Sequence, residues 1–209
     1  AGLFRQARPP NAPVGARWLS WISVPDPALS AQRVVQLGGQ VLVAPSAVSD
    51  RGTHALLRDP QGAVFGVLAA SGGDPPDDPV QAGDVFWLDL LTPEPARAAA
   101  FYAALIGYEV GESAPGEAPQ RRVLSSEGIA RAGVVALPPA AARPGWLPYI
   151  LVDDLAAALQ RVAAAGGRIV LAPRAEWLRG QLAVIADPNG GVIGLVDWWA
   201  ATRLAEAGR

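Results

Sequence analysis

The side chains that most often do chemistry in enzymes are scarce in this chain. His54 is the single histidine and cysteine is absent, which removes thiol nucleophiles, thiolate metal sites and disulfides. A serine nucleophile would need His54 beside it, and no Gly-x-Ser-x-Gly sequence is present. An oxygen-only metal site could be built from Asp89, Glu109 or Glu176, but nothing in their spacing favours one. We therefore expect no recognisable metal site, no cofactor, and a structural or solvent-facing His54.

Aromatic side chains are more prominent than reactive ones. Seven tryptophans is a high number for 209 residues. Most of them are expected to pack in the core, but Trp87 and Asp89 stand two residues apart in a strand-like segment and should share one sheet face. Apolar and aromatic lining with a few polar groups suits a small organic ligand. The candidate ligand contacts are Trp87, Asp89, Arg121, Tyr149, Glu176, Trp177 and Arg179.

Composition excludes some partners and leaves the compartment open. The formal net charge is -2 and no run of Lys or Arg stands out, which argues against a nucleic-acid or anionic-membrane surface. No stretch is long and apolar enough to span a bilayer. Methionine is absent even at position 1, so we expect that something upstream was removed or belongs to a longer chain. The absence of cysteine and of an initial methionine slightly favours an exported protein, but a trimmed cytosolic protein would look the same.

The elements that must position these residues come from an internal repeat. When the sequence is shifted by 128 residues, Trp18 to Gly66 overlays on Trp146 to Gly194 without a gap. The phrase Asp-Pro-x-Gly-x-x-x-Gly occurs in both copies, at 59–66 and 187–194. Two copies indicate a duplicated module and not a solenoid.

Each copy predicts the element order β-α-β-β-β. Apolar strands at 18–24 and 147–152 precede Asp26 and Asp154, which are typical helix N-caps. Helices are expected at 28–37 and 155–164, each ending at Gly-Gly. Strands follow at 40–43 and 168–171, each broken by Ala-Pro, and a strand pair is turned by Asp-Pro-x-Gly.

A different β-α-β-β-β unit lies between the copies. A strand at 84–90 precedes a helix that starts near Pro95 and ends at Gly107, and three strands follow up to 137. We refer to the three units as the N-terminal module (1–72), the middle module (84–137) and the C-terminal module (146–198). A Gly/Pro-rich linker is expected at 73–83 and a polar tail at 200–209.

The motifs resemble the vicinal oxygen chelate superfamily, which includes glyoxalases, bleomycin-resistance proteins and dioxygenases. The resemblance rests on DVFWLDLLTPEPARAAAFYAALIGYEV (84–110) and on two copies of GG-(x)4-AP followed by DPxGxxxG. It implies an α+β fold in which tandem βαβββ modules curl mixed or antiparallel sheets into a cup. It also implies that residues 84–199 form a complete C-terminal domain, and that 1–72 is the second module of an N-terminal domain whose first module is missing. The sheet face left open over residues 1–70 would then need a homodimer partner or a retained upstream fragment.

The same resemblance implies that the usual metal ligands are lost. The first-strand histidine of metal-using members would fall at Trp87, and the last-strand glutamate would fall at Gly66 and Gly194. None of these side chains can ligate a divalent cation. In family members the loop of Trp177 and Arg179 lies near the mouth of the cup.

Three functions remain open from the sequence. The first is a metal-free glyoxalase-like protein that binds a small organic molecule. The second is a lyase, isomerase or dioxygenase with an unconventional metal site or an acid–base pair such as Asp89 and Glu176. The third is a degenerate scaffold whose role is association, so whether the protein is an enzyme is left undecided.

Overall fold

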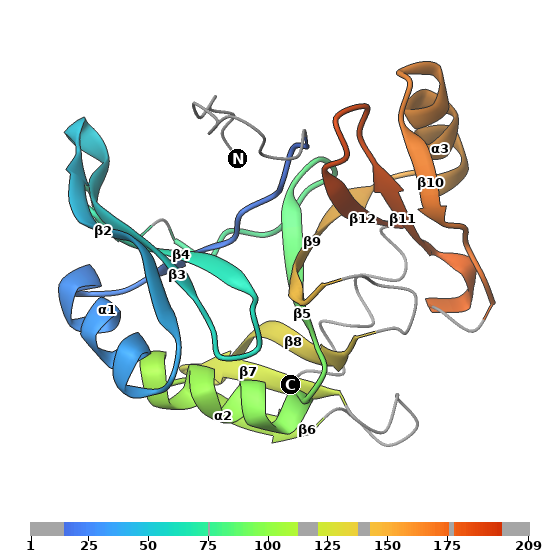
Figure 1. The fold of residues 1–209 in the computed structure, drawn as a ribbon. Helices are drawn as coiled ribbons and strands as arrows, with labels where there is room; N and C mark the ends of the chain where they lie inside the picture. Colours follow the sequence, from blue (N-terminus) through green and yellow to red (C-terminus); the bar gives the residue numbers. More distant parts are fainter. Residues whose placement is uncertain (1–14, 75, 113–120, 138–142, 176–177, 198–209) are drawn as a thin grey trace. The chain divides into compact units, whose positions relative to one another are not determined.

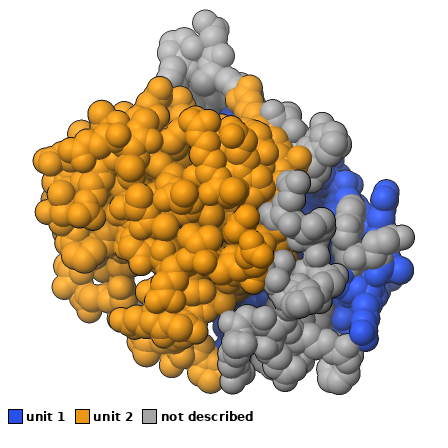
Figure 2. Space-filling model, turned by 90° about the horizontal axis from the view of Figure 1, so that it is seen from below, with its two compact units in different colours: residues 1–18, 80–86, 148–201 blue, residues 19–79, 87–147, 202–209 orange. Residues whose placement is uncertain are grey.

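The structure is a computed structural model, and it describes residues 15–74, 76–112, 121–137, 143–175 and 178–197. The chain divides into two compact units, which Figure 2 shows in different colours. Unit 1 holds residues 1–18, 80–86 and 148–201, and unit 2 holds residues 19–79, 87–147 and 202–209. Unit 2 thus contains most of the N-terminal module and the middle module, while unit 1 contains most of the C-terminal module.

The α+β class and the repeated β-α-β-β-β order are confirmed (Figure 1). The N-terminal module contains β1 (Trp21–Ser23), α1 (Pro27–Gln36), β2 (Gln40–Val48), the short 3-10 helix η1 (Ser49–Arg51), β3 (Gly52–Arg58) and β4 (Val64–Ala70). The middle module contains β5 (Val85–Thr92), α2 (Pro95–Ile106), β6 (Glu109–Glu112), β7 (Arg122–Ser126) and β8 (Ile129–Ala136). The C-terminal module contains β9 (Gly145–Val152), α3 (Leu155–Ala164), β10 (Arg168–Leu171), η2 (Leu178–Gly180), β11 (Leu182–Ala186) and β12 (Val192–Asp197).

Each module forms a mixed four-stranded arrangement in which the first strand lies parallel to the last. The strand orders are β1-β4-β3-β2, β5-β8-β7-β6 and β9-β12-β11-β10. The parallel pairs are β1 with β4, β5 with β8, and β9 with β12, and the other neighbours within a module are antiparallel. In each module the helix carries the chain from the first strand to the opposite edge, and antiparallel strands then lead back to the last strand beside the first. The first and last strands can therefore be parallel neighbours without a direct connection.

The predicted caps fix where the repeated helices begin. Asp26 Oδ1 accepts hydrogen bonds from the backbone N–H groups of Ala28 (2.8 Å) and Leu29 (3.0 Å). Asp154 Oδ1 accepts one from Ala157 N at 2.9 Å. These bonds satisfy amides that have no partner inside the helix. Helix α2 begins differently, because its N-cap Glu94 makes no side-chain cap bond.

The repeated turn is also as predicted. Asp59 Oδ1 accepts from Gln61 N and Ala63 N, both at 2.9 Å, and Asp187 Oδ1 accepts in the same way from Asn189 N (2.7 Å) and Gly191 N (2.9 Å). Gly62 and Gly190 have φ of 104° and 91°, a conformation that a side chain disfavours.

Two strand boundaries were predicted wrongly. The strand expected at 18–24 is only Trp21–Ser23, because its register with β4 covers just these residues. The strand expected at 40–43 does not end before Ala44-Pro45, because β2 continues to Val48. β2 is an edge strand, and its pairing with β3 shifts register between Val43 and Ser46. A proline without an N–H is tolerated at such an irregular edge. In the C-terminal module β10 does end at Leu171, before Ala172-Pro173.

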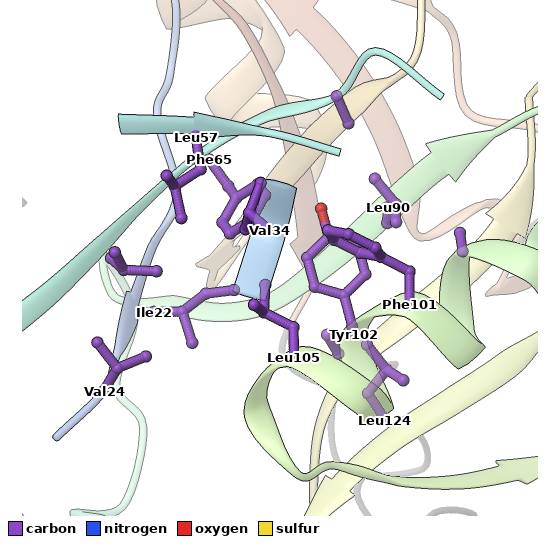
Figure 3. Packing of buried hydrophobic residues seen from close by; sticks show 14 of the residues in the cluster. Ile22, Val24, Val34, Leu57, Phe65, Leu90, Phe101, Tyr102, Leu105 and Leu124 are labelled. Atoms are coloured by element: carbon purple, nitrogen blue, oxygen red, sulfur yellow. The ribbon is translucent and has the colours of Figure 1, made fainter. Parts of the chain in front are cut away.

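The core of unit 2 is built from the faces of both its modules (Figure 3). Ile22, Val34 and Phe65 come from the N-terminal module, and Tyr102 and Leu124 come from the middle module. Phe65 packs edge-on against Tyr102, with ring centroids 5.2 Å apart. Such aromatic pairs stabilise by roughly 1 kcal/mol beyond their burial, so the two modules share one core.

Unit 1 has a smaller core of its own. Buried residues of α3, β11 and β12, such as Leu155 and Leu195, form it, and Trp18 packs against them. Among the residues that the structure describes, no helix is long and apolar enough to cross a membrane.

Candidate functional site

Strand β5 presents a polar cluster on one face and core residues on the other. Leu88 and Leu90 point into the core of unit 2. Trp87 and Asp89 alternate with them and therefore lie on the opposite face. Asp89 is buried and Trp87 is half-buried.

Three of the predicted ligand contacts come together on this face. Trp87 Nε1 donates a hydrogen bond to Asp89 Oδ1 at 2.9 Å. Arg121, which immediately precedes β7, lies with Nη2 3.4 Å from the same oxygen and with its guanidinium carbon 5.7 Å from the centre of the Trp87 ring. The Asp89 and Arg121 side chains are 8% and 19% exposed, so solvent screens this ion pair less than a surface pair. We call Trp87, Asp89 and Arg121 the β5 cluster.

The β5 cluster needs a glycine beneath it. Asp89 is the register partner of Gly133 in β8, and a Cβ placed on Gly133 would overlap the Asp89 carboxylate. A glycine inside a strand commonly marks such a close approach. Gly133 was not among the predicted site residues, although its position in the last strand of a module, like that of Gly66 and Gly194, could have indicated it.

The same relationship recurs in all three modules. Trp21 is the register partner of Gly66 and Tyr149 is the register partner of Gly194, and in both cases a Cβ on the glycine would overlap the facing ring. Each module thus lays one first-strand side chain over a last-strand glycine. The residue that differs is the first-strand one, which is Trp, Asp or Tyr.

The other predicted ligand contacts are not part of the β5 cluster. Tyr149 is buried in β9 of unit 1, where its ring lies over Gly194. Arg179 is exposed in η2 and has a left-handed backbone with φ of 55°. Glu176 and Trp177 lie outside the described residues, as do Trp198 and Trp199.

The facing first-strand and last-strand residues do not supply the ligands of an ordinary divalent-metal site. The first-strand and last-strand partners are Trp21/Gly66, Asp89/Gly133 and Tyr149/Gly194, of which only Asp89 is an ordinary metal ligand. Its ligating oxygen is already engaged by Trp87 and Arg121. Within the described ranges no three His, Cys, Asp or Glu side chains are grouped closely enough to hold a metal ion.

A second buried polar chain joins the two modules of unit 2. Tyr102 O–H donates to Asp59 Oδ2 at 3.2 Å, and Trp146 Nε1 donates to the Tyr102 oxygen at 3.2 Å. Burial raises the pKa of Asp59 above its ordinary value, although the hydrogen bonds from Ala63, Gln61 and Tyr102 oppose this. Burial and the neighbouring Asp59 charge raise the pKa of Tyr102 well above its usual range. Tyr102 therefore keeps its proton, which it donates to Asp59.

Gln61 adds a second link between these modules. Its side-chain Nε2 donates to the backbone oxygen of Glu94 at 3.1 Å, and Glu94 N donates to Gln61 Oε1 at 2.9 Å. The amide side chain from one module thus pairs with the backbone at the N-terminus of α2 in the other. Together with the Asp59–Tyr102 bond, this makes the Asp-Pro-Gln-Gly turn a docking element.

Comparison with known proteins agrees with this fold. The family described as "Glyoxalase-like domain" matches residues 86–196. The chain is 32% identical over 191 residues to the protein named "Putative glyoxylase CFP32" of Mycobacterium tuberculosis (strain CDC 1551 / Oshkosh), covering 90% of this chain and 73% of that protein. It is also 30% identical over 118 residues to the "Anthracycline biosynthesis protein DnrV" of Streptomyces peucetius, covering 50% of this chain and 43% of that protein.

A solved structure supports the fold alone. The Mn(II)-bound glyoxalase from Novosphingobium aromaticivorans superposes with a TM-score of 0.54 at 15% identity. The match covers 85% of this chain, which spans only 61% of that one. The family match, the mycobacterial relative and the βαβββ modules together show that this chain belongs to the glyoxalase-like proteins of the vicinal oxygen chelate superfamily.

Proposed function

We propose that this glyoxalase-like protein binds a small organic molecule at the β5 cluster, without a metal ion. The observation that carries the proposal is the Asp89–Arg121 pair, which lies on the sheet face turned away from the core and beside an indole ring. Removing two charges from water is costly. Apolar residues would avoid this cost. We therefore propose that the ion pair is retained because it orients a polar ligand.

The unused hydrogen-bonding groups of the β5 cluster indicate which chemical groups a ligand would need. Asp89 Oδ1 accepts the hydrogen bonds from Trp87 and Arg121, and Oδ2 has no partner in the described part of the chain. Oδ2 can therefore accept a hydrogen bond from a ligand hydroxyl, and the remaining N–H groups of Arg121 can donate to a ligand oxygen. The half-buried Trp87 ring offers a flat apolar surface. A hydroxyl and a carbonyl group held next to an aromatic ring would satisfy all three residues.

The metal-free part of the proposal follows from the donors. Asp89 is the single carboxylate among the three register pairs, and its charge is balanced by Arg121. A divalent cation there would have to displace the guanidinium or sit beside it. We therefore propose that Arg121 takes the electrostatic role that a cation has in metal-using relatives.

An acid–base enzyme is the second candidate. Trp87 and Arg121 both donate to Asp89 Oδ1, so Oδ2 is the oxygen left to act on a ligand. An ionised carboxylate with a free oxygen can accept a proton from carbon next to a carbonyl group. Proton exchange of 2-hydroxy-1-phenylethanone in D2O, followed by proton NMR, tests this: exchange that D89N abolishes supports catalysis, and exchange at the uncatalysed rate refutes it.

Binding is tested with the same compound, which has a phenyl ring, a carbonyl group and a hydroxyl group. Titration by calorimetry should give saturable binding that D89N and R121Q each weaken about tenfold or more, because each removes a charge-assisted hydrogen bond. The matched control is R122Q. Arg122 is the next residue after Arg121, and its substitution breaks only the more exposed ion pair with Glu112. Equal affinities in the unmodified protein, D89N and R122Q would refute the site.

A further inference from the structure

The N-terminal module carries a second aromatic and polar pair that the β5 cluster does not use. Trp21 of β1 and His54 of β3 lie edge to face, with ring centroids 5.5 Å apart and planes at 74°. Strand alternation puts both on the sheet face opposite Ile22, Ala55 and Leu57, which are buried in the core of unit 2. Trp21 and His54 therefore lie on the face of the sheet that points away from the core.

The position of Trp21 matches that of Asp89 in the middle module. Trp21 and Asp89 are each the register partner of a last-strand glycine, and both lie over that glycine. The residue Trp21 as a whole nevertheless remains 39% exposed. A large ring at the equivalent position, without full burial, is an available contact surface for a ligand.

The two nitrogens of His54 have different surroundings. Nδ1 is buried and has no hydrogen-bond partner within the described residues. Placing a proton on Nδ1 would bury an unpaired N–H group, so the neutral tautomer with the proton on Nε2 is favoured. The ring is half-buried, and Nε2–H is then the group that can donate a hydrogen bond to a ligand.

We propose that Trp21 and His54 form a second small-molecule site, which takes a flat aromatic compound with a carbonyl oxygen. The ring of the compound packs against Trp21, and its oxygen accepts a hydrogen bond from His54 Nε2–H. The site lies within one module and uses none of the β5 cluster residues. It can therefore be tested independently of the function proposed above.

His54 provides a direct readout because it is the single histidine of the chain. Nitrogen-15 NMR of the imidazole reports its tautomer and its ligand contacts without any assignment by mutation. Acetophenone is the probe, and ethylbenzene is the control that keeps the ring and ethyl skeleton but lacks the carbonyl oxygen. We expect the Nε2–H tautomer in the free protein. We also expect saturable shifts of the imidazole signals with acetophenone, and an affinity about five- to tenfold lower with ethylbenzene, as the loss of one hydrogen bond predicts.

Variants separate this site from others. H54L places in β3 the residue that the C-terminal module has at the matching position, Leu182, and it should reduce acetophenone binding in ligand-detected NMR. D89N should leave that binding unchanged. The proposal is overturned if the free protein shows the Nδ1–H tautomer, if saturating acetophenone leaves the imidazole signals in place, or if ethylbenzene binds equally well. The first two measurements use the unmodified protein and do not depend on whether a variant folds.

Discussion

Asp89 of β5 faces Gly133 of β8 as its register partner, and its carboxylate occupies the space that a side chain at Gly133 would need. The geometry of the candidate site is therefore set by a glycine that makes no polar contact through a side chain. The same relationship links Trp21 to Gly66 and Tyr149 to Gly194. In each of these three pairs a last-strand glycine leaves the space that the facing first-strand side chain occupies.

Replacing Gly133 by alanine should displace the Asp89 carboxylate. We expect G133A to lower the free energy of unfolding by about 1–3 kcal/mol, the usual cost of forcing extra volume into a packed site. It should also weaken binding at the β5 cluster. Urea denaturation measures the first effect and calorimetry the second. The control is G111A in β6, where an added Cβ meets no atom within 4 Å; equal stability losses in both variants would contradict the account.

The Tyr149–Gly194 pair allows a test by double-mutant cycle. G194A should destabilise the protein because a Cβ there overlaps the Tyr149 ring. In a Y149A background the ring is absent and the same change should cost much less. Free energies of unfolding for the four proteins give the coupling. Strictly additive losses would show that the ring and the glycine do not constrain each other.

Gln61 should matter more than its counterpart in the repeat. Q61A removes both hydrogen bonds to the backbone of Glu94, and we expect a loss of roughly 1–2 kcal/mol in unfolding free energy. Asn189 stands at the matching position of the second turn, where its backbone N–H, not its side chain, bonds Asp187. N189A should therefore be nearly neutral. A larger loss in N189A than in Q61A would overturn the docking role of the first turn.

Asp59 should make stability fall as the pH rises. Because burial raises the pKa of Asp59 in the folded protein, the folded state binds its proton more tightly than the unfolded state does. Its favourable contribution is present below the unfolded pKa and is lost as the pH rises through the higher folded pKa. Unfolding free energies of the unmodified protein and D59N, compared from pH 3 upwards, isolate this effect. The unfolding free energy of the unmodified protein relative to that of D59N should fall with rising pH and then level off. A relative unfolding free energy that rises with pH would contradict the prediction.

Tyr102 provides the companion test. Y102F removes the donor to Asp59 and the acceptor of Trp146 while keeping the ring in the core. Loss of the donor should raise the pKa of Asp59 further, so the pH-dependent fall should extend to higher pH. A cost of about 1–3 kcal/mol near neutral pH is expected from the groups left unpaired. An unchanged pH profile would show that the Tyr102–Asp59 bond does not affect the ionisation of Asp59.

Most of the fold could be predicted from the internal repeat. A constant offset of 128 residues aligned the Asp caps, the Gly-Gly helix ends and the Asp-Pro-x-Gly turns, and each of these features depends on local backbone chemistry. The Ala-Pro sequence follows the end of β10 but lies inside β2, although both are edge strands. The difference is that β2 resumes its pairing with β3 at Ser46, and such pairing with another strand is not visible in the local sequence.

The candidate site was predictable in part. Alternation along β5 placed Trp87 and Asp89 on one face, and Arg121 reaches them from the start of β7. The role of Gly133 follows from register across two strands, which the sequence alone does not reveal. The Asp59–Tyr102–Trp146 chain was not predicted either, because its members are far apart in sequence and come from three different modules.

The β5 cluster should bind its ligand without a metal ion, and one calorimetric comparison tests this directly. 2-Hydroxy-1-phenylethanone is titrated into protein stripped of metal with a chelator, and again after addition of Mn²⁺. We expect saturable binding with the same affinity in both states. Binding that appears only with Mn²⁺ would contradict the metal-free claim, and no binding in either state would contradict the proposed ligand chemistry.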